Sequence, residues 1–376
     1  MSFVSMEDAV RNRTGAMGKR RPLRVLLVCL KYDYGDHRRG LSFENVNFLD
    51  TLLNMRGVEC TFFPFDEILR EKGRDAMNDA LRRAIGKGAH DVCFFSLFTD
   101  EISPETIRWA SGEGGAKTLG WFGDDHWRFR GFSRHWAPYF DWIATTDSEA
   151  VEKYRAIGCR QVIKTQWGFN HHRCKTLGSP PEFDVTFVGQ VHSRRRRTVR
   201  LLRRAGIDVR CWGKGWNAGR LSQDDMIKMF SKSRINLNLV DSSVLFHWKP
   251  MAKVLLNRRA DGSLRLNSPF RMAENLVVLF VDRRPQIKAR TFEIPGSGGL
   301  LVTGHADNIE EYFVPDKEIV LFYSVHELIE KTRYYLAHSE QRELIRAAGE
   351  KRALRDHTFE HRFRTIFRAM GLLEKM

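Results

Sequence analysis

Short apolar runs that alternate with helical patterns are the feature of this chain that most restricts its fold. The first run, at residues 23–30, is continuously apolar, as expected of a strand buried on both faces of a sheet. Helical patterns separate it from further strand-like runs at 58–63, 91–95, 117–122, 142–145 and 161–164. This strand–helix alternation predicts a doubly wound parallel sheet in an α/β fold.

The same alternation starts again after a Pro- and Gly-containing break at residues 178–183. Further strands are expected at 184–188, 208–212, 235–240, 300–302 and 319–322. A length of 376 residues suits two domains. We therefore expect the following division: a basic tail (1–21), an N-terminal Rossmann-like domain (22–177), a C-terminal Rossmann-like domain (184–356) with a basic insertion (241–286), and a terminal amphipathic helix (357–376).

Basic residues exceed acidic ones, 62 against 46, for a net charge of +16. This excess favours anionic partners, namely nucleotide diphosphates, nucleic acid or an acidic lipid surface, without choosing among them. The six cysteines contain no CxxC pair, so we expect a reduced, cytoplasmic protein with no disulfide and no zinc site. The first 21 residues lack the apolar core of a signal peptide, and no run is long enough to span a bilayer.

The ends of two strands in the C-terminal half carry candidate binding residues. Gly189 precedes a run of arginines from which Arg194 and Arg197 are candidates, because a glycine turn, a helix start and guanidinium groups suit a diphosphate. The alternative is a solvated basic helix face. Trp212 and Trp216, which flank GKG, would wall a nucleotide base by stacking, or else pack in the domain core.

The strongest pattern lies at residues 286–302, QIKARTFEIPGSGGLLV. Two cations, Lys288 and Arg290, stand just before a helix that carries Glu293. A carboxylate at such a place can accept both hydroxyls of a ribose. The glycine-rich stretch that follows, with Gly298 and Gly299, allows a close approach of backbone to a ligand.

In the N-terminal half, the segment FGDDHWRF at 122–129 follows a strand, so its polar groups should face a cleft. Asp124, Asp125 and His126 are candidates for a general base toward an acceptor hydroxyl. The alternative is a loop in which an aspartate caps a helix and Trp127 packs beneath it. Metal binding is disfavoured, because consecutive residues of an extended segment point in opposite directions.

Two further loops at strand ends are candidates for the same cleft. The loop at 31–40 offers Gly35, Asp36 and Arg39, and Glu101 comes just beyond another strand. A plain surface turn is the alternative for the 31–40 loop. The pair His171–His172 has no recognisable metal spacing, so we expect surface residues there.

Three segments resemble the C-terminal glycosyltransferase domain of the CgeB-like (spore maturation type) family, which is one of the family-1/family-4-like transferases of GT-B fold. They are KARTFEIPGSGGLLVTG, EEYFVPDKEIVLFYSVHELIEKTRYYL and EQRELIRAAGEKRALRDHTFEHRF, over about residues 286–366. DVTFVGQVHSRRRR and CWGKGW fit the start of that domain, and KYDYGD and FGDDHW match the N-terminal half more loosely.

The resemblance implies a GT-B fold, with two Rossmann-like domains facing a cleft and a terminal helix that crosses back to the N-terminal domain. It implies that Glu293 binds the ribose, that Lys288 and Arg290 bind the diphosphate, and that no metal takes part. Many family-4 enzymes carry a second glutamate that contacts the donor sugar. Pro285 stands at that position here, which leaves the sugar open.

The function expected from these patterns is transfer of a hexose from a nucleotide-diphosphate sugar, with no cofactor. The acceptor would be a hydroxyl of a polysaccharide, protein, metabolite or modified nucleic acid, and an anionic polymer or a peripheral membrane contact is a further possible partner. The alternatives are an inactive GT-B nucleotide-binding or scaffold module and a nucleic-acid-binding Rossmann protein.

Overall fold

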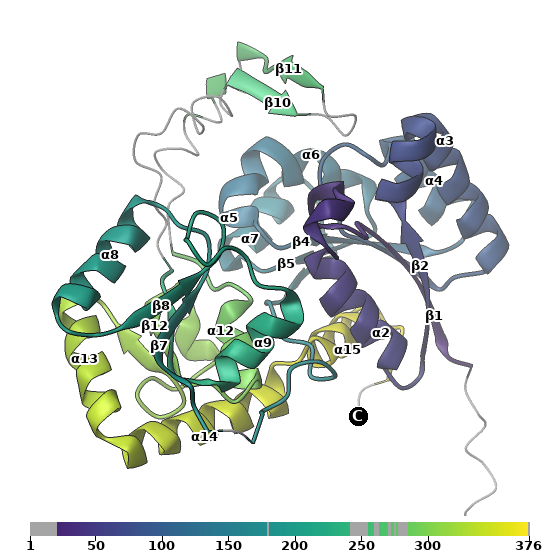
Figure 1. Ribbon diagram of the computed structural model, residues 1–376. Coiled ribbons are helices and arrows are strands. Elements are labelled where there is room, and N and C mark those ends of the chain that lie inside the picture. The colour runs from purple at the N-terminus through teal and green to yellow at the C-terminus, as the bar shows by residue number, and fades with distance from the viewer. Residues whose placement is uncertain are drawn as a thin grey trace, which may run out of the picture.

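The protein consists of two α/β halves that lie side by side, as the computed structural model shows (Figure 1). The structure describes residues 21–178, 180–240, 255–258, 263–269, 272–273, 276 and 285–374. Most of the predicted basic tail, residues 1–20, and much of the predicted insertion lie outside these ranges.

The N-terminal half is built on a six-stranded parallel sheet in the order β2-β1-β3-β4-β5-β6. The apolar runs of its inner strands are buried on both faces, as their lack of alternation predicts, whereas the edge strand β2 is partly exposed. Helices α3, α4 and α7 cover one face, and α2 lies on the other. The bounds are β1 (Leu23–Cys29), β2 (Val58–Pro64), β3 (Val92–Phe95), β4 (Lys117–Phe122), β5 (Trp142–Thr145), β6 (Val162–Lys164), α2 (Asp50–Asn54), α3 (Phe65–Gly88), α4 (Pro104–Ser111) and α7 (Ser148–Ala156).

The C-terminal half repeats this plan with a five-stranded parallel sheet in the order β13-β12-β9-β7-β8. Helices α8 and α13 pack on one face, and α9 and α12 on the other. The bounds are β7 (Phe183–Val188), β8 (Val209–Trp212), β9 (Ser233–Asn238), β12 (Leu301–Gly304), β13 (Val320–Phe322), α8 (Ser193–Arg204), α9 (Gln223–Ser231), α12 (Arg290–Gly296) and α13 (Val325–Ala337).

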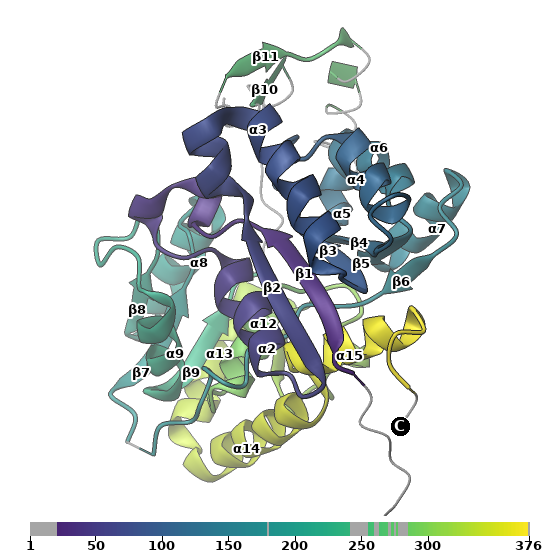
Figure 2. The same ribbon diagram turned by 90° about the vertical axis from the view of Figure 1, so that its right-hand side faces the viewer.

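The last two helices, α14 (Ser339–Asp356) and α15 (Phe359–Ala369), return the chain to the N-terminal half (Figure 2). The apolar face of α15 is buried against the first sheet, where Phe363 packs on Phe48 and Phe94 with ring centroids 5.4 and 5.5 Å apart. The linker between the halves is the segment between β6 and β7. It runs beside the start of α15, since Phe169 exchanges backbone hydrogen bonds with His357 and Phe359. The predicted crossover helix is therefore present.

The remaining elements are short. Within the predicted insertion, β10 (Leu256–Arg258) and β11 (Leu264–Leu266) form an antiparallel hairpin that lies apart from both sheets in Figures 1 and 2. The other short elements are the turns Asp33–Gly35, His37–Arg39, Asn45–Leu49, Phe129–Ser133, Ala137–Tyr139 and Ile309–Glu311, and the helices α5 (Asp125–Arg128) and α6 (Arg134–Trp136). Within the described ranges, no helix combines the length and the apolar character needed to cross a membrane.

The packing of α15 gives the first testable prediction. Phe363 is fully buried, so Phe363→Ala should lower the free energy of unfolding by about 3–5 kcal/mol through lost burial and a residual cavity. Leu344→Ala on α14, where the side chain is 66% exposed, is the control and should cost less than about 1 kcal/mol. Urea unfolding followed by tryptophan fluorescence measures both values. Equal effects of the two substitutions would contradict the packing of α15 on the first sheet.

Candidate functional site

An ion pair between the two halves brings two of the predicted site segments together. Lys288 precedes α12 in the C-terminal half, and its Nζ lies 2.7 Å from Oδ1 of Asp124, which lies two residues after the end of β4 in the N-terminal half. The Nε2 atom of His126 lies 3.4 Å from the same Nζ. Burial by itself would raise the pKa of Asp124, but the Lys288 ammonium holds this pKa below its usual value. We call this place, formed by Asp124, His126 and Lys288, the junction.

The start of α12 is held in position by the ends of two strands. Asn238, the last residue of β9, donates from Nδ2 to Thr291 Oγ1 and Thr303 Oγ1, both at 3.2 Å. The helix ends at Gly296, and Gly298 shortly after it has a φ of +72°, the left-handed conformation that follows many helix ends. These contacts explain why Lys288 and Arg290 lie together at the carboxyl edge of the second sheet.

The two glycines of this segment are packed against the protein itself. A Cβ at Gly298 would lie 2.3 Å from Thr176 Oγ1 of the linker, and one at Gly299 would lie 2.6 Å from Asn236 Nδ2. Their predicted role in the approach of a ligand stays a prediction. Glycine is needed here because the linker and β9 pass so close to the backbone.

Glu293 and Arg290 pair with each other. The Glu293 side chain is 2% exposed, and its Oε2 accepts a hydrogen bond from Nη1 of Arg290. The Nε of Arg290 is buried and has no hydrogen-bond partner among the described residues. The Glu293 carboxylate is therefore covered by the Arg290 guanidinium and does not face open solvent.

Asp125 points away from the junction, into the core of the N-terminal half. It is 1% exposed, and its Oδ2 accepts hydrogen bonds from Thr145 Oγ1 at 2.6 Å and Tyr154 OH at 2.8 Å. Burial raises the pKa of Asp125 to about 7. The prediction of Asp125 as a base toward an acceptor is wrong, because α5 begins at this residue and turns the side chain inward.

Glu101 is also interior. Its Oε1 accepts from the backbone N–H of Thr99 at 2.6 Å, and burial raises its pKa to about 7. The predicted position in a cleft is therefore wrong for this residue. The neighbouring Arg128, which the sequence pattern did not single out, donates to the Phe98 carbonyl at 2.7 Å and attracts four carboxylates, those of Asp124, Glu101, Asp125 and Glu44.

The loop at 31–40 reaches the second half through an ion-pair chain. Asp33 accepts from Arg39 of its own loop at 2.8 Å and from Arg220 of the C-terminal half at 3.0 Å. Asp36 caps its own turn, and the Arg38 side chain lowers its pKa to about 2. Gly35 adopts a φ of +71°. The loop thus lies between the halves. Within it, Arg39 forms an ion pair with Asp33, and Arg38 forms one with Asp36.

The glycine turn after β7 is filled by side chains of its own half. A Cβ at Gly189 would lie 2.8 Å from the Phe187 ring, and the Gly189 carbonyl accepts from Trp216 Nε1 at 2.9 Å. Trp216 packs edge-on against Phe187, and Trp212 packs in the same way on Phe183. Packing within the domain, the second alternative for these tryptophans, therefore fits both of them better than stacking on a nucleotide base.

Among the arginines that open α8, the one that reaches the strand ends is Arg195. It donates to the carbonyls of Gln190 at 2.9 Å and Leu239 at 2.8 Å, and so joins the ends of β7 and β9. Arg194 and Arg197 are exposed on the helix surface. Their contact with a phosphate stays a prediction.

Comparisons with known proteins agree with this architecture. Residues 194–368 match the family described as Glycosyl transferase-like. Similar solved structures include the Anabaena protein HepE in complex with UDP-glucose (TM-score 0.59, 8% identity, 93% of this chain and 100% of that chain) and sucrose-phosphate synthase from Thermosynechococcus elongatus (0.54, 10%, 93% and 97%). A glycosyltransferase from Rickettsia africae is also similar (0.57, 11%, 95% and 100%). No curated protein matches the sequence.

These findings confirm the predicted GT-B fold class, with two Rossmann-like halves. They confirm glycosyl transfer as the general function at the level of the glycosyltransferase-like domain that residues 194–368 form. Because the solved structures are only 8–11% identical to this chain, their similarity shows the fold alone. Lys288 and Arg290, the cations predicted to bind the donor, lie inside the matched segment.

Asp125 gives a prediction about pH. Its pKa is about 7 in the folded protein and about 4 when unfolded, so between these values the folded state holds an extra proton. The free energy of unfolding should therefore fall as pH rises from 4 to 7, by up to about 1.4 kcal/mol per pH unit from this group. Asp125→Asn should remove this contribution to the slope of the unfolding free energy against pH, as measured by urea unfolding at several pH values. The exposed Asp208 provides the control substitution, and an unchanged slope in Asp125→Asn would refute the assignment.

Proposed function

We propose that this chain is an active glycosyltransferase of the CgeB-like type that moves a hexose from a nucleoside-diphosphate sugar to an acceptor hydroxyl, without a metal at the reacting diphosphate. The observation that carries the proposal is the Lys288–Asp124 pair, because it joins a cation of the matched domain to an acid of the other half at one point. HepE is described in complexes with UDP-glucose and with UDP and glucose, which makes UDP-glucose the first donor to test.

On the donor side, Lys288 and Arg290 bind the diphosphate and Glu293 binds the ribose. Arg290 already covers Glu293, so donor binding exchanges partners: the guanidinium turns to the phosphates and the carboxylate accepts the ribose hydroxyls. The buried and unpartnered Nε of Arg290 supports this exchange, since a phosphate oxygen would satisfy it. The two cations then stabilise the charge that develops on the departing diphosphate.

On the acceptor side, Asp124 and His126 are the candidates for the proton acceptor. When Lys288 turns to the diphosphate, Asp124 loses its ion-pair partner and its carboxylate becomes available to an acceptor hydroxyl. In the reaction, the acceptor oxygen bonds to the anomeric carbon, the bond from that carbon to the diphosphate oxygen breaks, and the acceptor proton passes to Asp124 or His126. The diphosphate leaves as an anion held by Lys288 and Arg290.

A cytoplasmic location is part of the proposal. All six cysteines are free, and four of them are buried. Buried free thiols are ordinary in a reducing compartment. Nucleotide sugars that are made in the cytoplasm would then reach the enzyme directly.

The donor assignment predicts the behaviour of Lys288→Met. Loss of a charge-assisted hydrogen bond to phosphate should weaken binding of UDP by about 10- to 100-fold, because such a bond contributes roughly 1.5–3 kcal/mol. Isothermal titration calorimetry with UDP, GDP and dTDP measures the affinities and identifies the preferred nucleotide. Lys232→Met is the matched control, since Lys232 pairs with Glu182 of its own half. A wild-type protein that binds none of the three nucleotides would support the scaffold alternative instead.

The acceptor assignment predicts a split between binding and turnover in Asp124→Asn. The substitution removes the competitor for Lys288, so the affinity for the nucleotide should hold or rise, whereas kcat for release of UDP from UDP-glucose should fall by about 100-fold or more. His126→Asn, made alongside, shows which side chain accepts the proton. Unchanged kcat in both variants would remove the junction from the catalytic machinery.

A further inference from the structure

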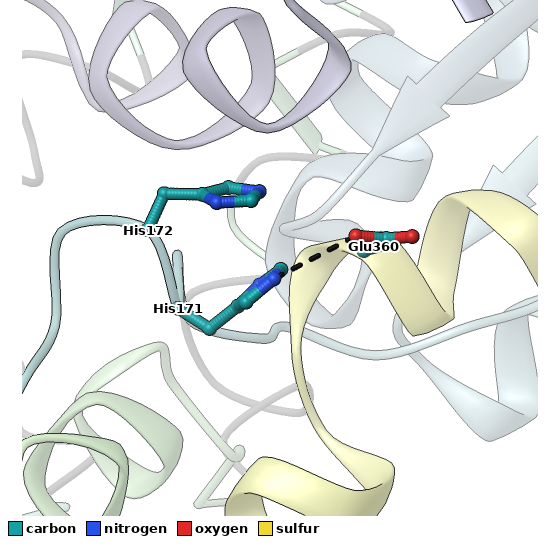
Figure 3. A group of neighbouring side chains, drawn as sticks. All are labelled: His171, His172 and Glu360. Atoms are coloured by element: carbon teal, nitrogen blue, oxygen red, sulfur yellow. Dashed lines mark ion pairs between the residues drawn. The ribbon is translucent and has the colours of Figure 1, made fainter. Parts of the chain in front are cut away.

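A second group of polar side chains lies where the two connections between the halves meet. His171 and His172 belong to the linker, and Glu360 belongs to the first turn of α15 (Figure 3). All three side chains are half-buried, although surface residues were expected for the histidine pair. Among the residues that the structure describes, this is the one group of three or more His, Cys, Asp or Glu side chains with the spacing of a metal site.

The geometry of the group is compact. His171 Nε2 lies 3.6 Å from Glu360 Oε2, and the two imidazole rings have centroids 3.9 Å apart. One ligand atom from each residue can be chosen so that all three lie within 4.8 Å of one another. In a tetrahedral zinc site the donor atoms are about 3.3 Å apart, so small side-chain rotations would complete the coordination.

Two ring nitrogens of this group lack an ordinary explanation. His171 Nδ1 and His172 Nε2 are buried and have no hydrogen-bond partner among the described residues. A buried polar atom in that state costs about 1–3 kcal/mol. The ion pair between His171 Nε2 and Glu360 leaves both of these nitrogens without a partner, whereas a cation bound beside Glu360 would be ligated by His172 Nε2 and so account for that atom.

Neighbouring contacts position the Glu360 side chain and the backbone of His172. Arg364 donates to Glu360 Oε1 at 2.8 Å, which leaves Oε2 directed at His171. The backbone N–H of His172 donates to Asn170 Oδ1 at 3.0 Å, and Asn170 in turn donates to the Val46 carbonyl at 2.8 Å. Outer contacts of this kind orient metal ligands in known sites.

We propose that His171, His172 and Glu360 bind a divalent transition-metal ion, Zn²⁺ in the first place, which clamps the linker to the terminal helix. Two imidazoles and one carboxylate are a zinc donor set, whereas Mg²⁺ and Ca²⁺ prefer oxygen ligands alone. The linker and the start of α15 are already joined by the hydrogen bonds of Phe169. The metal therefore strengthens an existing contact between the two connections and stiffens the hinge of the two halves, apart from the junction.

The test is zinc binding to protein that has been treated with EDTA and dialysed. Titration calorimetry should show one site per chain in the wild type, and Zn²⁺ should raise the melting temperature. His172→Asn should weaken zinc binding by at least about 10-fold and abolish the rise. It should leave the metal-free melting temperature unchanged, because its Nε2 has no partner to lose. Glu360→Gln is the second variant, although it also alters the contact with Arg364.

The matched control is His326→Asn, since His326 is 82% exposed and pairs with Glu330. This variant should bind zinc like the wild type. Any binding of zinc to the cysteines would be the same in all the variants, because the cysteines are unchanged. If the wild type binds zinc no more tightly than His172→Asn does, the proposal is wrong. Nucleotide affinity measured on the same variants should not change, which separates this site from the donor site.

Discussion

The Lys288–Asp124 ion pair is the interaction on which the account of this protein depends. It connects the two halves of the protein. Asp124 lies near the carboxyl end of β4, and Lys288 lies just before the start of α12. Ligands of open α/β sheets bind at the carboxyl ends of the strands, and the pair lies where two such edges meet. The ion-pair chain of Arg39, Asp33 and Arg220 is a second link between the halves.

The charges proposed to act on the donor satisfy one another in this conformation. Lys288 is paired with the half-exposed Asp124, and Arg290 is paired with the buried Glu293. Among these four groups the Glu293 carboxylate is the buried one, and a buried charge without its partner is strongly destabilising. The proposed recognition of the donor is therefore an exchange of partners. In the proposed exchange, the diphosphate takes the place of the two carboxylates beside Lys288 and Arg290. The ribose and the acceptor hydroxyl then take the place of these cations beside Glu293 and Asp124.

The eleven predicted strands of the two sheets are all present, because continuous apolar runs such as 23–30 have few alternatives to a buried parallel strand. The position of Asp124 and His126 after a strand predicted that they face a cleft, and both lie beside Lys288 of the other half. The same prediction failed for Asp125, since the direction of that side chain depends on the residue at which α5 begins. The helical segment at 125–136 contains an irregular turn that hides its period, so Arg128 escaped notice. The group of His171, His172 and Glu360 joins segments far apart in sequence, and only the crossing of α15 brings them together.

A crystal structure of the protein with UDP and the intact junction tests the central claim most directly. We expect Lys288 Nζ and the Arg290 guanidinium within about 3 Å of diphosphate oxygens, and a ribose hydroxyl at a similar distance from the Glu293 carboxylate. We also expect that Asp124 has lost its ion pair with Lys288. Nucleotide bound elsewhere, with Lys288 still paired with Asp124 and Arg290 still paired with Glu293, would refute the proposed donor site.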